Sequence, residues 1–423
     1  MCTRIKYGFN DVPSPSETSI LAFQHALAAF GSIIAVPLIV GSAIGLSSRD
    51  ISFLVNMALI ASGIGTLIQT IGLGPMGAKV PCLMGTSIKF VTPAIQVGGV
   101  YGLSEIFGCT IVASLLEVVL SRFLKYIKRI FTPTVRGCVI MLIGLTFMPV
   151  GITWISGSVE SLALGLLVMV FVVVLSIFGK GIISTGSVLW GMLLGYIISF
   201  PLGLVTEFDP FAGGYISIPQ PLKYGFSLHV SALLPFLIVY IVSMIETIGD
   251  LLAIEEICDE EIGADGLAKG ILADGGTSTI AGFFNAMPLS SFSQNIGIIS
   301  LTGVASRGVV ALAGVIFIIS GLLPPVGNIF GAMPQPVLGG AVIIMFGLVV
   351  AAGIRVLKDA EMSRRNMLIM AVSLSLGVGV SAFPELLEPL SQEVRMVFGS
   401  GIVTGSLAAI VMELLLPEEK DVA

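Results

Sequence analysis

The sequence has little charge and few of the residues that usually carry out chemistry. Charged side chains make up only 11% of the 423 residues, against about 25% in an ordinary soluble domain. No Gly-rich phosphate loop, His/Cys metal cluster or nucleophile with a neighbouring base is present. We therefore expect no resident metal or cofactor, no energy-coupling nucleotide site, no nucleic-acid partner and no enzymatic activity.

Cysteine is also scarce and follows no recognisable pattern. The chain has five cysteines, and none stands at a metal-ligand or CxxC spacing: Cys2, Cys82, Cys109, Cys138 and Cys258. All but Cys2 lie within or at the ends of apolar stretches. We interpret them as packing residues and expect no disulfide.

Long apolar stretches are what the sequence does have, since 55% of its residues are hydrophobic. Stretches of roughly 17 to 25 apolar residues can each cross a membrane as a helix. We predict an all-α polytopic membrane protein with about fourteen spans, whose ends are uncertain by a few residues. They lie near 18–40, 51–72, 82–98, 103–121, 133–151, 159–178, 184–204, 229–253, 267–286, 288–303, 308–323, 335–354, 366–383 and 398–416.

The distribution of Lys and Arg predicts how the chain is oriented. The segment before the first span has no cleavage site of the signal-peptide type, so the first span acts as its own insertion signal. With the N-terminus in the cytoplasm, all Lys and Arg outside the spans lie inside the cell except Arg49, Lys223 and Arg395. We therefore expect both termini to be cytoplasmic and the number of spans to be even. The acidic run from Glu255 to Glu261 is predicted to be a solvated loop.

A repeat relates the two halves of the chain. Six residues recur at a constant offset of about half the chain length: Pro133, Gly137, Val139, Ile140, Gly144 and Leu145 match Pro336, Gly340, Val342, Ile343, Gly347 and Leu348. The same offset lays the short span 82–98 on the short span 288–303. Because each half then holds an odd number of spans, the halves cross the membrane with opposite polarity. A 7+7 inverted repeat of this kind is common among secondary transporters.

The third and tenth spans are interrupted at corresponding places. Pro81 precedes one interruption, and Pro288 with a run of serines precedes the other, so a short extended segment followed by a helix is predicted in each. Such backbone is tolerated at membrane depth only where it is buried in protein or lines a cavity. Paired interruptions are the best sequence indication of a substrate site.

Acidic residues in the second half mark the predicted site. Glu246 and Asp250 lie one helical turn apart at the end of an apolar run, and carboxylates buried there need a function or a partner. Their mutual repulsion makes one shared proton plausible, and burial makes Glu246 and Asp274 candidates for carrying a coupling proton. Glu246 and Gln294 together suit a flat heterocycle with N–H and C=O edges. The simpler interpretations are a structural Glu246, and a Gln294-Asn295 pair that only caps a helix.

Two basic residues within the spans remain open to interpretation. His25 in the first span is more often a helix-to-helix hydrogen bonder than a proton relay. Lys89 could extend its amine to the membrane surface, pair with a carboxylate or attract an anionic substrate.

These motifs resemble the nucleobase-ascorbate transporters, also called the second group of nucleobase:cation symporters. The resemblance covers essentially the whole chain. It rests on Gln24-His25, Glu246-Thr-Ile-Gly249-Asp250, Ala273-Asp274-Gly275, and Gln294-Asn295-Ile-Gly297 continuing to Thr302-Gly303 with Arg307 beyond.

The resemblance implies a fourteen-span inverted repeat, divided into a core domain (18–121 and 229–323) and a gate domain (133–204 and 335–416). It implies a homodimer that takes up a nucleobase by alternating access across the plasma membrane, with proton symport or sodium in the proton's place. The implied substrate contacts are Glu246, Gln294, Ser293, Ser87 and Ile88. Asp250, Asp274, Asn295 and His25 would support proton coupling, and the roles of Lys89, Thr302 and Arg307 stay open.

The same resemblance favours a purine as the substrate. Gln at position 294 with Asp at position 250 is similar to carriers of xanthine or uric acid, whereas uracil carriers tend to have Glu and His there. Ile88 stands where relatives often have Phe, and Lys89 replaces a small or uncharged residue, which favours an anion such as urate. The alternatives are a uracil or pyrimidine permease of this family and an anion transporter of the same 7+7 architecture.

Overall fold

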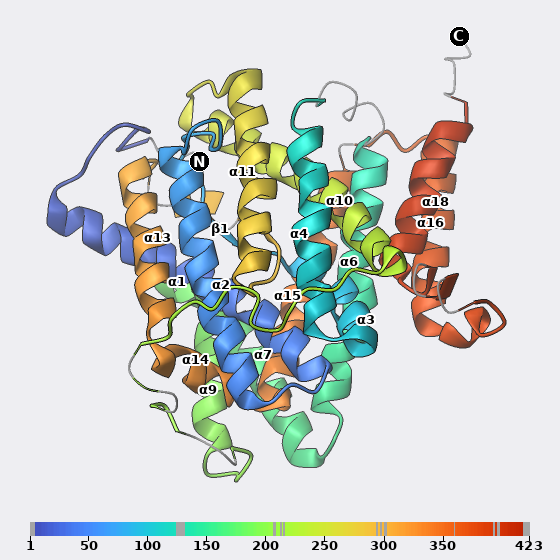
Figure 1. Cartoon of the computed structure of the whole chain (residues 1–423), viewed down its shortest axis with the longest axis horizontal. Coiled ribbons are helices and arrows are strands. Elements are labelled where there is room, and N and C mark those ends of the chain that lie inside the picture. Colours follow the sequence, from blue (N-terminus) through green and yellow to red (C-terminus); the bar gives the residue numbers. More distant parts are fainter. Residues whose placement is uncertain are drawn as a thin grey trace.

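The computed structural model describes residues 5–123, 132–205, 209–211, 214, 216–292, 295–296, 298–299, 303–358, 360–391, 394–395 and 398–417. Almost all of its regular structure is helical (Figure 1). The helices before residue 205 are α1 (Pro15–Ala43), α2 (Ser48–Ile71), α3 (Val91–Tyr101), α4 (Leu103–Leu120), α6 (Pro133–Ile155), α7 (Val159–Phe178), α8 (Ile182–Thr185) and α9 (Ser187–Ser199). Those that follow are α10 (Val230–Cys258), α11 (Gly263–Phe283), α13 (Arg307–Leu322), α14 (Pro324–Gly331), α15 (Gln335–Leu357), α16 (Arg364–Ala382) and α18 (Gly401–Leu415).

Most helices coincide with predicted spans, but fewer than fourteen satisfy a length and hydropathy criterion. In the described part of the chain, 8 helices are long and apolar enough to cross a membrane, or up to 9 if the bent pair α13 and α14 forms one span. Two predicted spans are only the shorter apolar helices α9 and α18, with 13 and 15 residues. The total of fourteen therefore stays a prediction.

Two local predictions were wrong. The helix α10 continues to Cys258, so Glu255 and Glu256 are helical and not part of a loop. Burial of Ile254 and Cys258 in a small apolar cluster stabilises these extra turns. The predicted span 308–323 is followed by an unpredicted helix, α14, at a bend of 75°. The bend lies at Leu323, because Pro324 disfavours helical dihedral angles in the residue that precedes it.

The helices pack in two sets. In the first set, α13 packs against α1 and α2, and α4 packs against α10 and α11. In the second set, α6 packs against α15, α16 and α18, and α7 packs against α9 and α15. Glycines allow close approach within each set. A Cβ atom at Gly144 would lie 2.6 Å from the carbonyl oxygen of Phe346, and one at Gly63 would lie 2.4 Å from that of Gly314.

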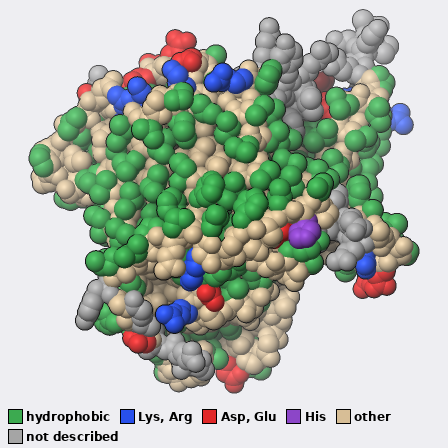
Figure 2. All heavy atoms as spheres, in the orientation of Figure 1, with side chains coloured by type: hydrophobic (Ala, Val, Ile, Leu, Met, Phe, Trp, Pro, Cys, Tyr) green, Lys and Arg blue, Asp and Glu red, His purple; other side chains and the backbone are tan. Residues whose placement is uncertain are grey.

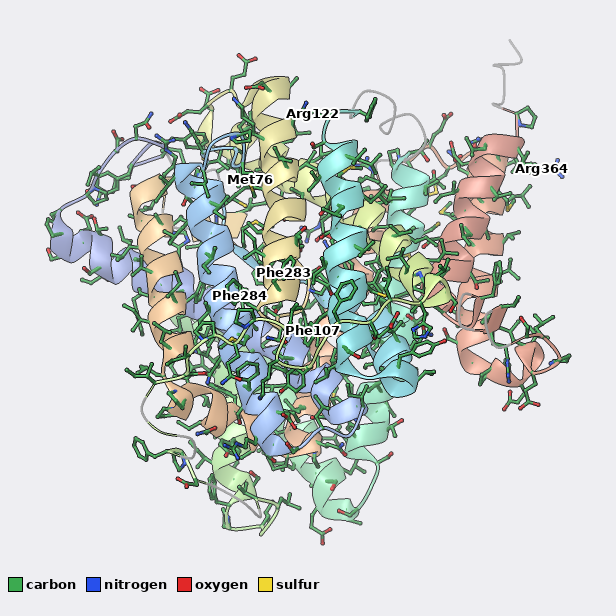
Figure 3. All side chains as sticks on the ribbon, in the orientation of Figure 1. Met76, Phe107, Arg122, Phe283, Phe284 and Arg364 are labelled. Atoms are coloured by element: carbon green, nitrogen blue, oxygen red, sulfur yellow. The ribbon has the colours of Figure 1, made fainter. Side chains whose placement is uncertain are left out.

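The surface is arranged as expected for a protein that crosses a bilayer. Hydrophobic side chains cover the middle of the face in Figure 2, and charged side chains gather along its upper and lower edges. Arg122 after α4 and Arg364 at the start of α16 lie toward the same edge in Figure 3, as the orientation prediction requires of them. Cys82, Cys109, Cys138 and Cys258 are buried free thiols, as predicted.

Two short strands occupy the predicted interruptions. Strand β1 (Met84–Thr86) pairs antiparallel with β2 (Leu289–Ser291), with Met84 opposite Ser291. Both strands are fully buried, and the backbone N–H of Ser87 donates to the carbonyl of Pro288 at 2.8 Å. A short helix, η1 (Ile88–Phe90), then leads from β1 into α3. The two breaks in the helical pattern, far apart in sequence, therefore lie side by side in the protein.

Candidate functional site

A buried lysine forms an ion pair with Glu246 beside the strand pair. Lys89 Nζ, from η1, lies 2.7 Å from Glu246 Oε2, on α10. The Lys89 side chain is 6% exposed and that of Glu246 is 33% exposed. Of the three roles left open for Lys89, the structure shows pairing with a carboxylate. The ion pair therefore has one end in protein and the other end open to solvent.

Two hydroxyl groups connect the other two carboxylates of the predicted site. Ser291 Oγ, from β2, donates to Asp250 Oδ2 at 2.8 Å and lies 3.0 Å from Thr247 Oγ1. Thr247 Oγ1 in turn donates to Asp274 Oδ2. Asp250 and Asp274 are both buried. The hydroxyls therefore form a continuous polar path between a residue on α10 and one on α11.

Asp250 does not share a hydrogen bond with Glu246, although the two lie one turn apart. Glu246 pairs with Lys89 and Asp250 accepts from Ser291, so within the described residues each carboxylate has its own partner. A single proton shared by these two side chains, which the sequence made plausible, stays a prediction.

A cavity of about 170 Å³ opens beside these groups, between the two sets of helices. Glu246, Gly249 and Asp250 line it from α10. Opposite them, α6 and α15 contribute one basic and three apolar side chains, Arg136, Val139, Ile140 and Val356. A Cβ atom added at Gly249 would meet nothing within 4 Å. The mixture of an apolar lining with a few charged groups is typical of a small-molecule site.

His25 and Asn295 hold the strand pair against α1. His25 Nδ1 lies 2.8 Å from Asn295 Oδ1, and Asn295 Nδ2 donates to the carbonyl of Pro81. Both side chains are buried. Asn295 therefore ties the segment after β2 both to α1 and to the segment before β1. This geometry is that of a structural bridge, the commoner role anticipated for His25.

Replacing Asn295 by Ala is expected to destabilise the protein by about 2–4 kcal/mol, because the change leaves a buried imidazole and a buried carbonyl without their hydrogen bonds. Thermal unfolding of the purified variant measures the loss. The Asn295→Asp variant keeps an oxygen that faces His25 but loses the N–H that donates to the Pro81 carbonyl, so it is also expected to be less stable than the unmodified protein. An Asn295→Ala variant as stable as the unmodified protein would contradict the bridging role.

The structure places the remaining predicted residues in different surroundings. Ser87 is buried, its Oγ has no hydrogen-bond partner in the described part of the chain, and Ile88 packs against the main apolar cluster. Arg307 lies apart from the cavity lining and donates to Asn10 Oδ1 and to the carbonyls of Phe9 and Lys79, so it anchors the N-terminal segment. Ser293, Gln294 and Thr302 lie outside the described residues.

Sequence reasoning missed three polar residues of this region. Thr247 lies inside the quoted Glu246-to-Asp250 motif, and Ser291 precedes the predicted Ser293 by two residues. Since side chains alternate along a strand, only the register of β2 reveals that Ser291 faces α10. Arg136 was not singled out from the sequence, yet it lines the cavity. Among the described residues, no group of His, Cys, Asp and Glu could hold a metal ion.

Comparison with known sequences finds close similarity to permeases. The profile of the Permease family matches residues 16–386. "Putative purine permease CPE0397" of Clostridium perfringens is 44% identical over 97% of this chain and 93% of its own length. Xanthine permease XanP of Escherichia coli is 35% identical over 98% and 95% of the two chains. Uric acid permease PucJ of Bacillus subtilis is 35% identical over 93% and 91%.

Solved structures share the fold at much lower sequence identity. The transmembrane domain of the cyanobacterial bicarbonate transporter BicA superposes with a TM-score of 0.63 and 13% identity, covering 95% of this chain and 99% of that one. The murine anion transporter Slc26a9 in its inward-facing state gives a TM-score of 0.64 and 12% identity, covering 94% and 68%. At this identity the similarity concerns the arrangement of the helices and not the substrate.

Proposed function

Because this chain belongs to the Permease family, the nucleobase-ascorbate transporters, whose profile spans residues 16–386, we propose that it takes up a purine nucleobase, xanthine or uric acid, together with protons. The protein is a multi-pass membrane permease and not an enzyme. The observation that carries the proposal is the cavity that brings Glu246 and Asp250 to the junction of the two helix sets. A carboxylate in such a place can bind a ligand and respond to its charge.

The substrate binds next to the Glu246 carboxylate. Glu246 is the solvent-accessible end of the ion pair and can accept hydrogen bonds from ring N–H groups of a purine. The amide of Gln294 and the hydroxyls of Ser87 and Ser293 supply further donors and acceptors, and Ile88 contacts the face of the ring. The buried Ser87 Oγ, which has no partner among the described residues, favours this role.

The balance of buried charge supports proton coupling. Glu246, Asp250 and Asp274 all act electrostatically on the single ammonium of Lys89. Several carboxylates around one cation leave a surplus of negative charge at low dielectric, which protons offset at the least cost. Asp250 and Asp274, joined through Ser291 and Thr247, are the groups that take up the coupling proton. Sodium in the proton's place is the alternative.

Transport proceeds by alternating access. The core domain, 18–121 and 229–323, moves against the gate domain, 133–204 and 335–416. The position of the cavity supports this division, because α10 lines it from one side and α6 and α15 line it from the other. The working protein is a homodimer in the plasma membrane, formed through the gate domains, with both termini in the cytoplasm.

The test is uptake of radiolabelled xanthine and urate into cells whose proton gradient can be collapsed with a protonophore. We expect accumulation that falls to equilibration when the gradient is removed and that does not require external sodium. Undiminished accumulation without the gradient excludes proton coupling. Competition by unlabelled uracil separates a pyrimidine carrier from a purine carrier, and channel-like currents without concentrative uptake would favour an anion transporter.

A further inference from the structure

A fully buried glutamate outside the cavity, Glu117, has no hydrogen-bond partner among the described residues. Glu117, on α4, has 0% exposure, and neither of its carboxyl oxygens has a hydrogen-bond partner within the described ranges. Glu105, on the same helix and also 0% exposed, accepts from Ser227 Oγ and from the backbone and ring nitrogens of His229. Its hydrogen bonds therefore explain how the Glu105 carboxylate is buried, whereas no such bonds explain the burial of Glu117.

Glu117 faces α11 next to Asp274. A Cβ atom at Gly275, the residue after Asp274, would lie 2.9 Å from Glu117 Cβ. The ionisable side chains that face Glu117 are Asp274 from α11, Lys89 from η1 and Tyr240 from α10. Asp274 uses Oδ2 to accept from Thr247, and its Oδ1 has no partner among the described residues. Two neighbouring helices thus each present unused carboxyl oxygens.

These two carboxyl groups cannot both be ionised. Each is fully buried between helices, and Lys89, the cation that acts on both, is already paired with Glu246. Two adjacent buried carboxylates repel each other at low dielectric, and the lowest-energy arrangement has one proton between them. The protonated member is then neutral, and a neutral carboxyl group costs less to bury than a second carboxylate.

We propose that Glu117 and Asp274 share one proton and that Glu117 carries the coupling proton from Asp274 to the end of α4 at Arg122. In this step the proton on Asp274 Oδ1 moves to the Glu117 carboxylate, and Asp274 remains as an anion stabilised by Thr247 and Lys89. Glu117 then releases the proton to water. At 1.5 Å per residue, Glu117 lies about 4.5 Å along the helix from Leu120, where α4 ends, and Arg122 beyond this end is exposed. Glu117 does not line the described cavity, so proton and substrate leave by separate routes.

This proposal rests on the proposed function and is tested with the full-length protein in cells and in proteoliposomes. Glu117→Gln removes the proton-accepting group. We expect the variant to lose proton-driven accumulation and the pH dependence of influx, while exchange of internal for external xanthine persists because it needs no net proton movement. Glu105→Gln, a change of the same kind on the same helix, is expected to keep the pH profile of the unmodified protein.

Infrared spectroscopy supplies a readout independent of transport. The purified unmodified protein is expected to show a protonated-carboxyl band that shifts in D₂O and is lost in Glu117→Met. This second variant replaces an unpartnered carboxyl by an apolar chain of similar length, so it is expected to fold even if Glu117→Gln does not. An unmodified protein whose uptake ignores the proton gradient contradicts the proposed coupling, whereas the infrared band still decides whether Glu117 holds a proton.

Three results would overturn the inference, and the first two would leave the proposed function intact. They are an unchanged pH profile with full accumulation in Glu117→Gln, an infrared band that survives in Glu117→Met, and stabilisation of the unmodified protein by sodium that Glu117→Gln abolishes. The last result would assign the site to a metal cation and not to a proton.

Discussion

Glu246→Gln is expected to abolish both accumulation and exchange of xanthine and urate. The change removes the carboxylate that borders the cavity and leaves the Lys89 ammonium, 6% exposed, without its ion-pair partner. Removing one member of a fully buried pair costs roughly 3–5 kcal/mol. Because the Glu246 side chain is 33% exposed, we expect a loss of about 2 kcal/mol in the free energy of unfolding, which leaves the protein folded.

Three measurements separate these effects. Thermal unfolding checks the stability, counterflow of labelled xanthine checks exchange, and the thermal shift caused by a panel of nucleobases checks binding. Glu17→Gln is a suitable control, since Glu17 pairs with Lys6 at 2.6 Å on the surface and exposed pairs contribute little to stability. Normal accumulation by a stable Glu246→Gln variant would remove Glu246 from the mechanism.

Lys89→Met is expected to shift the substrate preference from urate toward xanthine. Methionine keeps the apolar stem and removes the charge, so a substrate that binds beside Glu246 as an anion loses the cation paired with that carboxylate, while a neutral substrate loses much less. We expect the ratio of urate to xanthine affinity to fall about tenfold, since about 1.4 kcal/mol corresponds to a factor of ten. Competition binding of both purines to the purified variant measures the ratio.

The matched control is Lys6→Met, which removes an exposed lysine from its pair with Glu17. This control is expected to leave both affinities unchanged. A second comparison uses the double variant Lys89→Met with Glu246→Gln, in which neither charge of the ion pair remains. We expect it to unfold at a higher temperature than Glu246→Gln alone, because no unpaired ammonium stays buried. An unchanged ratio of urate to xanthine affinity in Lys89→Met would show that Lys89 does not select the substrate and only forms the ion pair with Glu246.

The sequence predicted those features of this region that depend on local signals. Pro81 and Pro288 predicted interruptions of two spans, and β1 and β2 lie immediately after them. Glu246 and Asp250 were identified because a carboxylate is costly within an apolar run, and both line the cavity. Glu117 carried the same signal in the span 103–121 and was overlooked, because no neighbouring motif drew attention to it.

Contacts between residues far apart in the sequence could not be predicted. The contact of Lys89 with Glu246 joins residues far apart in sequence, and the sequence left three roles for Lys89 open. Ser291 and not another serine meets Asp250 because of the pairing of β2 with β1. Nothing in the sequence around Arg136 marked it as a site residue, whereas the packing of α6 beside α10 places it at the cavity.

The sequence by itself determined that this protein is a multi-pass membrane permease, where most of its helices run and where two of them break. These properties depend on apolar length, proline and glycine, which act on a few residues at a time. Only the tertiary structure decided which polar groups meet: Lys89 with Glu246, Asp250 with Ser291, and His25 with Asn295. It also placed Glu117, which has no hydrogen-bond partner among the described residues, against the side of α11 that carries Asp274. A buried charge or hydroxyl must find its partner across the fold, so its role is fixed by helix packing and not by its neighbours in the chain.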